Sequence, residues 1–322
     1  MGIFRRRERR DGADVPRDGE LTLLSEAEAT RLRELVRTAF AEHGLDVTVG
    51  PASATAGTGW NFNLANLAAV CHNDGGGPRS WPALVNEHVA RVVRSVAARQ
   101  APPALPREEL LTRVHPRLVT SDPASLKAFG YGPRSVPGLL EVLALDLPET
   151  VDLLPEDSLS ELGGQEALRE RAFRNLRAVE ADRHEVVTGD NGTRFDVLTG
   201  DSYFIGSLAL IIDEVAARYS GDLPAPHGIL VALPHRHALA FHVVRDLEVL
   251  PSLHGMARFA AAAFTEAPGN LTPSVFWWFE GGFTEVATHG GADLPVVLTQ
   301  EGTDLMARIG DPGAEDSERR SG

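Results

Sequence analysis

The chain has 322 residues, of which 43% are hydrophobic and 24% are charged, a composition typical of a folded globular protein. Its formal net charge of -14 argues against the whole chain being a nucleic-acid-binding protein, because an acidic surface repels phosphates. Cys71 is the only cysteine, which excludes an intramolecular disulfide and a cysteine-rich zinc site. No apolar run approaches the roughly 18 residues that cross a bilayer, and no apolar segment follows the first arginines as a secretory signal requires. We therefore expect a soluble, cytoplasmic protein.

Residues 1–20 are polar and without periodicity, and they predict a disordered basic tail. Its positive charges are Arg5, Arg6, Arg7, Arg9 and Arg10, with Arg17 further along. A short block of like charge is usually solvated and disordered, which is the interpretation that we favour. The alternative is weak contact with an anionic surface, either a membrane or a nucleic acid.

Residues 21–100 predict an N-terminal α+β subdomain. Ser25 and Glu28 have the spacing of a capping box, in which two side chains satisfy free backbone N–H groups at the start of a helix. Gly44 stands where a left-handed C-terminal cap is expected. Between them, apolar residues recur with helical periodicity at Leu32, Leu35, Val36, Ala39 and Phe40. Three prolines within residues 101–106 then predict a linker.

Residues 107–298 predict a C-terminal α+β domain, and residues 299–322 a polar C-terminal tail. Within the domain, residues 110–119 and 139–147 predict strands, and residues 203–219 predict a mostly apolar helix. Further strands pair as hairpins, for example through Asn191-Gly192. Because helices alternate with hairpins and not with single strands, the sequence favours an antiparallel α+β fold of two subdomains over a doubly wound parallel sheet.

Three histidines form the best candidate for a metal site. His235 and His237 are two residues apart, which places two imidazoles on one side of an extended strand, and His242 follows on the partner strand. No carboxylate in this hairpin completes the set, so polar turn residues are the favoured interpretation. A second candidate is a thiol nucleophile, Cys71, with His72 or His88 as its base. A lone cysteine in an apolar helix is more often a small buried core residue.

An aromatic strand near the C-terminus is the candidate for protein interaction. Trp277, Trp278 and Phe279 follow one another, so strand alternation places them on both faces of a sheet. Either the strand is buried on both sides, which is favoured, or one face binds a partner.

Several short segments resemble the YtpQ-like family of bacterial proteins of unknown function. They are RAFRNL (residues 171–176), FDVL (195–198), GDSYFIGSL (200–208), GILVALP (228–234) and LTPSVF (271–276). The resemblance covers about the second two-thirds of the chain. Gly206 stands where the family usually has an acidic residue. The resemblance implies a soluble bacterial α+β protein, and it carries over no activity, cofactor or site residue.

The sequence lacks a P-loop, a Gly-x-Ser-x-Gly elbow and a His-Glu-x-x-His helix, and Lys127 is the only lysine. We therefore favour a non-enzymatic protein that acts through protein interaction and uses no cofactor. The rival hypothesis is an undescribed enzyme of the hydrolase type, which uses the three histidines with a metal ion or the Cys71–His72 pair.

Overall fold

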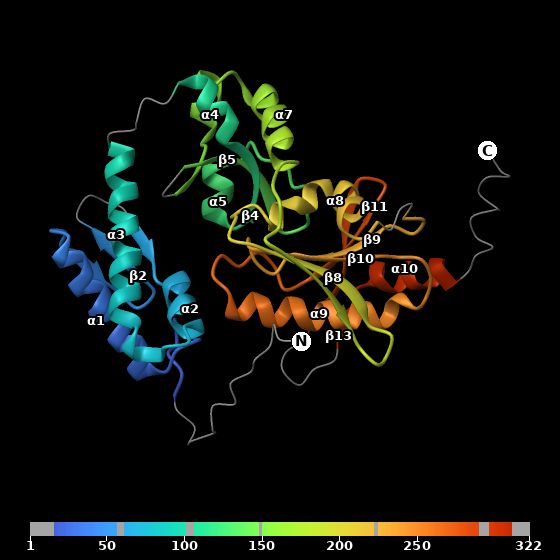
Figure 1. Ribbon diagram of the computed structural model, residues 1–322, viewed down its shortest axis with the longest axis horizontal. Coiled ribbons are helices and arrows are strands. Elements are labelled where there is room, and N and C mark those ends of the chain that lie inside the picture. The colour runs from blue at the N-terminus through green and yellow to red at the C-terminus, as the bar shows by residue number, and fades with distance from the viewer. Residues whose placement is uncertain are drawn as a thin grey trace. The chain divides into compact units, whose positions relative to one another are not determined.

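The computed structural model describes residues 16–56, 61–100, 106–147, 150–221, 225–289 and 296–310 (Figure 1). The chain divides into two compact units, residues 1–101 and residues 102–322. The division falls in the proline-rich segment, residues 101–106, for which the sequence predicts a linker. Helices and antiparallel sheets make up both units, so the predicted α+β class is confirmed. Among the described helices, none combines the length and the apolar character needed to cross a membrane.

The N-terminal unit packs helices against a small sheet. Its antiparallel sheet has the order β1 (Val47–Val49), β2 (Ser53–Ala56), β3 (Asn61–Asn63). The helices are α1 (Glu26–Glu42), α2 (Ala65–Asn73) and α3 (Trp81–Gln100), with a short 3₁₀ segment, η1 (Gly77–Arg79). The apolar stripe of α1 is buried at Leu32, Val36, Ala39 and Phe40, and it packs with residues of α2 and α3 in one core.

Both predicted ends of α1 are confirmed. The Ser25 hydroxyl accepts a hydrogen bond from the Glu28 backbone, and the Glu28 carboxylate accepts one from the Ser25 N–H. Gly44 follows the helix with a φ of 72°, a left-handed conformation that favours glycine.

The predicted tail, residues 1–20, needs a correction at its end. Residues 16–20 are described, and an ion pair of 2.8 Å joins Asp18 to Arg33 of α1. Leu21 and Leu24 are buried in the same core as α1. The order of this segment therefore comes from long-range contacts, which its polar composition did not reveal.

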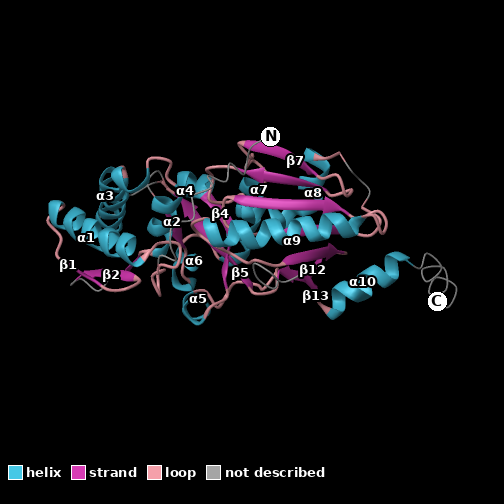
Figure 2. Cartoon of the chain, turned by 90° about the horizontal axis from the view of Figure 1, so that it is seen from below, coloured by secondary structure: helices cyan, strands magenta, loops and turns pink. Residues whose placement is uncertain are grey.

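The C-terminal unit is built on a seven-stranded antiparallel sheet. Its order is β13 (Val296–Leu298), β12 (Gly282–His289), β11 (Val275–Phe279), β9 (Ile229–Ala232), β10 (Ala238–Val243), β8 (Arg194–Thr199), β7 (Arg183–Thr188). One face packs on α9 (Val249–Glu266) and α10 (Gln300–Gly310), and Figure 2 shows α9 lying along the strands. The other face packs on η2 (Gly206–Ile211) and α8 (Ile212–Tyr219).

A second, three-stranded antiparallel sheet belongs to the same unit. Its order is β4 (Val114–Thr120), β5 (Leu139–Asp146), β6 (Val151–Leu153). Leu118 and Leu139 share a core with η2, α8 and the large sheet, so η2 and α8 are packed against residues of both sheets. The short helices around this sheet are α4 (Arg107–Arg113), α5 (Pro123–Ala128), α6 (Glu156–Glu161) and α7 (Gln165–Leu176).

Three sequence predictions are corrected in this unit. Residues 110–113 end helix α4, and the strand begins only at Val114. Residues 203–219 are not one helix, because Ile211 has a φ of -131° between η2 and α8. Residues 300–310 of the predicted polar tail form α10, whose Leu305 and Ile309 are buried one turn apart. The apolar face of α10 is only a few residues wide. Most residues of this segment are polar, and for that reason the sequence predicts a tail and not a helix.

Candidate functional site

The loop between β9 and β10 is held by two backbone contacts with residues 200–206. Gly200 N–H donates to the His237 carbonyl at 3.2 Å, and Gly206 N–H donates to the Arg236 carbonyl at 3.0 Å. Arg236 N–H in turn donates to the Gly269 carbonyl at 3.1 Å. The loop is therefore fixed on both sides, and it presents its side chains beside Tyr203.

Two glycines make this close approach possible. A Cβ at Gly206 would lie 3.2 Å from the His235 carbonyl oxygen, which is closer than most side chains tolerate. A Cβ at Gly269 would lie 2.8 Å from the Nε of Arg236, and Gly269 has a φ of 76°. The Arg236 side chain therefore lies directly against the backbone at Gly269, in a space that only glycine leaves open.

We call Arg117, Tyr203, His235, Arg236 and His237 the arginine–tyrosine cluster. All five residues are half-buried and belong to the C-terminal unit. The guanidinium carbon of Arg236 lies 4.5 Å from the centre of the Tyr203 ring, and that of Arg117 lies 5.6 Å from it. Both contacts are within the range of a cation–π interaction.

His237 holds the Arg236 side chain in place. Arg236 Nε–H donates to His237 Nε2 at 2.9 Å, and His237 Nδ1 lies 3.1 Å from the Gly200 carbonyl oxygen. Because Nε2 accepts and a carbonyl can only accept, His237 carries its proton on Nδ1. Both of its ring nitrogens are therefore engaged.

Arg117 approaches the cluster from the smaller sheet. The backbone N–H of the next residue, Leu118, donates to the Ser207 hydroxyl at 3.0 Å, and His115 stacks on Phe204 with ring centres 4.5 Å apart. These contacts fix β4 against residues 204–207. The Nε atom of Arg117 is fully buried, yet it has no hydrogen-bond partner in the structure.

The cluster holds two guanidinium charges that no carboxylate of the described residues contacts directly. Burial, and then the charge of Arg236, lower the pKa of Arg117 to about 10, so its guanidinium stays charged at neutral pH. Burial, followed by His237 and Arg236, lowers the pKa of His235 to about 4, and burial followed by Arg236 lowers that of His237. Both imidazoles are therefore neutral at pH 7. Within the described part of the chain, neither Arg117 nor Arg236 forms an ion pair with a carboxylate.

The three histidines proposed as metal ligands are not arranged as a metal site. The rings of His235 and His237 are 6.3 Å apart, and His235 Nδ1 accepts a hydrogen bond from the His237 N–H at 3.3 Å. His242 lies along β10, opposite Leu230 of β9. No group of three or more histidine, cysteine, aspartate or glutamate side chains among the described residues is placed to hold a metal ion.

Cys71 is a core residue of the N-terminal unit. Its exposed fraction is 1%, and the Trp81 indole donates to its carbonyl at 3.0 Å. Burial raises the pKa of the Cys71 thiol to about 12, so the nucleophilic thiolate is not populated at neutral pH. His88 contacts the Phe62 ring, with centres 5.6 Å apart.

The aromatic strand β11 places its side chains on both faces of the large sheet. Trp278 packs with the η2 and α8 side, and Trp277 with the α9 and α10 side. Trp277 stacks on Phe279 with ring centres 5.1 Å apart, and the Arg308 guanidinium of α10 lies over both rings. All three aromatic residues are half-buried, so neither face of the strand is bare.

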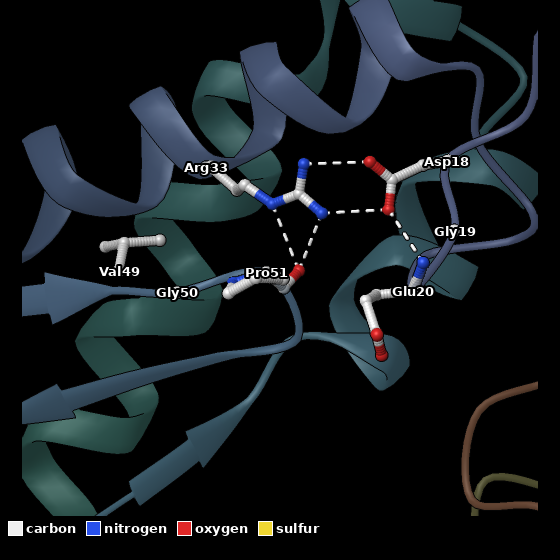
Figure 3. Close-up of a pocket in the computed structure, with 7 residues that line it drawn as sticks. All are labelled: Asp18, Gly19, Glu20, Arg33, Val49, Gly50 and Pro51. Carbon is white, nitrogen blue, oxygen red and sulfur yellow. Dashed lines mark hydrogen bonds and ion pairs between the residues drawn. The ribbon is translucent and has the colours of Figure 1, made fainter.

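A surface pocket in the N-terminal unit has a volume of about 450 Å³ and contains Arg33 (Figure 3). Arg33 donates to both carboxylate oxygens of Asp18, at 2.9 and 2.8 Å, and to the Pro51 carbonyl. These bonds hold the pKa of Asp18 well below its usual range. The Arg33 guanidinium already has hydrogen-bond partners within the protein. We therefore assign it a structural role, in which it holds the segment around Asp18 against α1.

Sequence reasoning also missed a histidine–aspartate pair on strands β7 and β8. His184 Nε2 lies 2.7 Å from Asp196 Oδ1, and Asp196 is buried. The His184 ring also contacts Tyr219 edge-on. No hydroxyl or thiol among the described residues hydrogen-bonds to His184, so the pair lacks a nucleophile. The arginines in residues 5–10 lie outside the described residues.

Comparison of the chain with family models, with curated proteins and with solved structures gave no match.

Proposed function

We propose that the protein recognises an anionic ligand at the arginine–tyrosine cluster, and that it acts as a binding module without catalysis of its own. The observation that carries the proposal is the buried Nε of Arg117, which has no partner and lies in a cluster with a second guanidinium. An unpaired buried donor costs about 1–3 kcal/mol, and more when the group is charged. A buried donor without a partner therefore needs an explanation, and a bound ion is one of those that occur in proteins.

An anion bound at the guanidiniums would offset part of the cost of holding their charges in a half-buried place. Guanidinium groups donate hydrogen bonds in a planar fork that matches carboxylate and phosphate oxygens. Each cluster arginine faces Tyr203, and the neutral imidazole of His237 holds Arg236 without neutralising it. The net charge of -14 repels anions from the chain as a whole. Anion binding would therefore be confined to a local positive site such as this cluster.

Thermal unfolding tests this proposal. Sulfate, phosphate, malonate and acetate would each be compared with chloride at equal ionic strength, because a ligand that binds only the folded state raises the Tm. We expect at least one of them to stabilise the native chain and to have no such effect on R117Q or R236Q. Arg308→Gln is the matched control, because it removes another guanidinium from aromatic rings outside the cluster. Equal stabilisation of all four proteins, or of none, would contradict the proposal.

A second candidate function is protein interaction through Trp277, Phe279 and Arg308. We propose it because tryptophan and arginine are the residue types that most often dominate binding at interfaces. Here they are stacked together and half-buried. A peptide-display selection against the native chain tests it. The selected peptides should bind W277A at least about tenfold more weakly than the native chain, and they should bind R236Q as they bind the native chain. Equal binding to W277A and to the native chain would contradict the proposal.

We also propose membership of the YtpQ-like family and a cytoplasmic location. The resemblance segment 200–208 contains Tyr203. The segment 228–234 is followed directly by the loop that carries Arg236. The single cysteine fits a reducing compartment.

A further inference from the structure

We propose that the ligand of the arginine–tyrosine cluster is a dianionic phosphoryl group. This inference rests on the proposed function above and names the chemical class of its ligand. It follows from the hydrogen-bond donors of the cluster, from the number of its charges and from the absence of a carboxylate partner in the described residues.

The cluster offers donors to a ligand and no carboxylate acceptor. Arg117 makes no hydrogen bond with its side chain among the described residues, so none of its guanidinium nitrogens is already engaged. Arg236 uses Nε for His237, which leaves its two terminal nitrogens. His235 accepts on Nδ1 from the backbone, and its neutral ring therefore carries a proton on Nε2.

This donor set fits a group that accepts hydrogen bonds on several sides. A phosphoryl group has three strong acceptor oxygens, whereas a carboxylate has two oxygens in one plane. The cluster arginines belong to different parts of the fold: Arg117 to the smaller sheet, and Arg236 to a loop of the larger sheet. A tetrahedral anion that accepted from both guanidiniums would tie the two sheets together.

The charge of the cluster also matches a dianion. The two guanidiniums carry the positive charge, because both loop histidines are neutral at pH 7. A phosphate monoester carries about -1.5 to -2 at pH 7. A single carboxylate would leave one positive charge uncompensated in a half-buried site.

One carboxylate, Asp146 at the end of β5, acts on Arg117, but it is exposed and forms no ion pair with either guanidinium, so solvent screens its charge. The titratable and charged groups that act on the cluster, from β4, from the end of β5 and from the two loops, are His115, Arg117, Asp146, Tyr203, His235, Arg236 and His237. Burial lowers the pKa of His115 as well. All three histidines are therefore neutral at pH 7. The second ionisation of a phosphate monoester, with a pKa of about 6, adds a pH dependence that sulfate lacks.

Isothermal titration calorimetry of the full chain tests the inference with four probes: inorganic phosphate, phenyl phosphate, sulfate and malonate. We expect both phosphates and sulfate to bind, and malonate to bind at least about tenfold more weakly. Phenyl phosphate binding should weaken about tenfold from pH 7.5 to pH 5, while that of sulfate, a dianion throughout, should change less. Tighter binding of phenyl phosphate than of inorganic phosphate would identify an organic ester as the source of the group, and the reverse would identify the free ion.

Matched variants complete the experiment. R117K and R236K keep the charge but lose the guanidinium fork, and each should weaken phosphate binding about tenfold. R174K makes the same change at an exposed arginine of α7, outside every proposed site, and should bind as the native chain does. Circular dichroism establishes that each variant is folded. If a lysine variant is not folded, Y203F, which keeps the aromatic ring but loses the hydroxyl, is measured in its place. If malonate binds as tightly as phosphate, the phosphoryl inference is wrong and anion recognition stands. If no probe binds, both are wrong.

Discussion

The hydrogen bond from Arg236 Nε to His237 Nε2, 2.9 Å long, joins a charged side chain to a neutral one that follows it directly in the sequence. A neutral imidazole orients the guanidinium without cancelling its charge, which a carboxylate in the same place would do. The other nitrogen of His237 is fixed by the Gly200 carbonyl, so the arrangement depends on one tautomer.

Replacing His237 with phenylalanine should therefore weaken the cluster without removing a charge. H237F keeps a ring near Tyr203 but loses the acceptor for Arg236, and a hydrogen bond to a charged group contributes about 1.5–3 kcal/mol. We expect sulfate affinity, measured by calorimetry, to fall about tenfold. His254→Phe, at an exposed position of α9, is the control. Unchanged affinity in H237F would show that Tyr203 alone positions Arg236.

The loop histidines predict a loss of stability in acid. The pKa of His235 is about 4 in the folded chain and about 6.5 in the unfolded chain. Between these values the unfolded state binds the extra proton, so the free energy of unfolding falls as the pH drops from about 6.5 to about 4. Urea unfolding at pH 7 and pH 5 should show a loss on the order of 1 kcal/mol or more that is smaller in H235Q, where His115 and His237 still contribute. An equal loss in H235Q would assign the effect to other groups.

Gly269 predicts a link between backbone conformation and ligand binding. G269A introduces a Cβ 2.8 Å from the Arg236 side chain at a φ of 76°, so it should cost about 1–2 kcal/mol and displace Arg236. G281A is the matched control, because Gly281 has a φ of 82° but open space around it. Both variants should lower the Tm, and only G269A should lose sulfate affinity. Equal affinity in the two would show that Arg236 tolerates the displacement.

The parts of the fold that could be predicted depend on local signals. The capping box of Ser25 and Glu28, and the positive φ of Gly44, are fixed by neighbours a few residues away, and both were found in the sequence. The strand from Val114 and the helix α10 depend on packing with distant residues. Leu305 and Ile309 become a core face only because the large sheet lies beneath them.

The candidate site was predictable only in part, for a related reason. The spacing of His235 and His237 suggests a pair of metal ligands, because the sequence does not show that Arg236 Nε donates to one ring nitrogen of His237. Nothing local distinguishes Arg117 from a surface arginine of an amphipathic strand. Its position became informative only when the tertiary structure placed it beside Tyr203 with a buried, unpaired Nε.

Helix α10 gives a direct test of the corrected C-terminal region. A Cβ at Gly302 would lie 2.2 Å from the Val286 carbonyl oxygen of β12, so G302A should push the helix away from the sheet. We expect a loss of about 1–3 kcal/mol and faster hydrogen exchange in residues 300–310. T303A changes an exposed position of the same helix and should leave exchange as it is. Slow exchange of α10 in G302A would mean that the helix is not seated on β12.

The pair of His184 and Asp196 predicts a coupling that can be measured by a double-mutant cycle. Asp196 is buried, and His184 is its hydrogen-bond partner at 2.7 Å across the β7–β8 edge. H184A leaves a buried carboxylate without that partner, so it should cost about 1–3 kcal/mol. D196N should lower the free energy of unfolding by less in the H184A background than in the native chain, because the amide carries no charge to desolvate. A coupling energy close to zero in urea unfolding would show that the two side chains are solvated independently, and that the edge strand β7 is held by its backbone ladder with β8 alone.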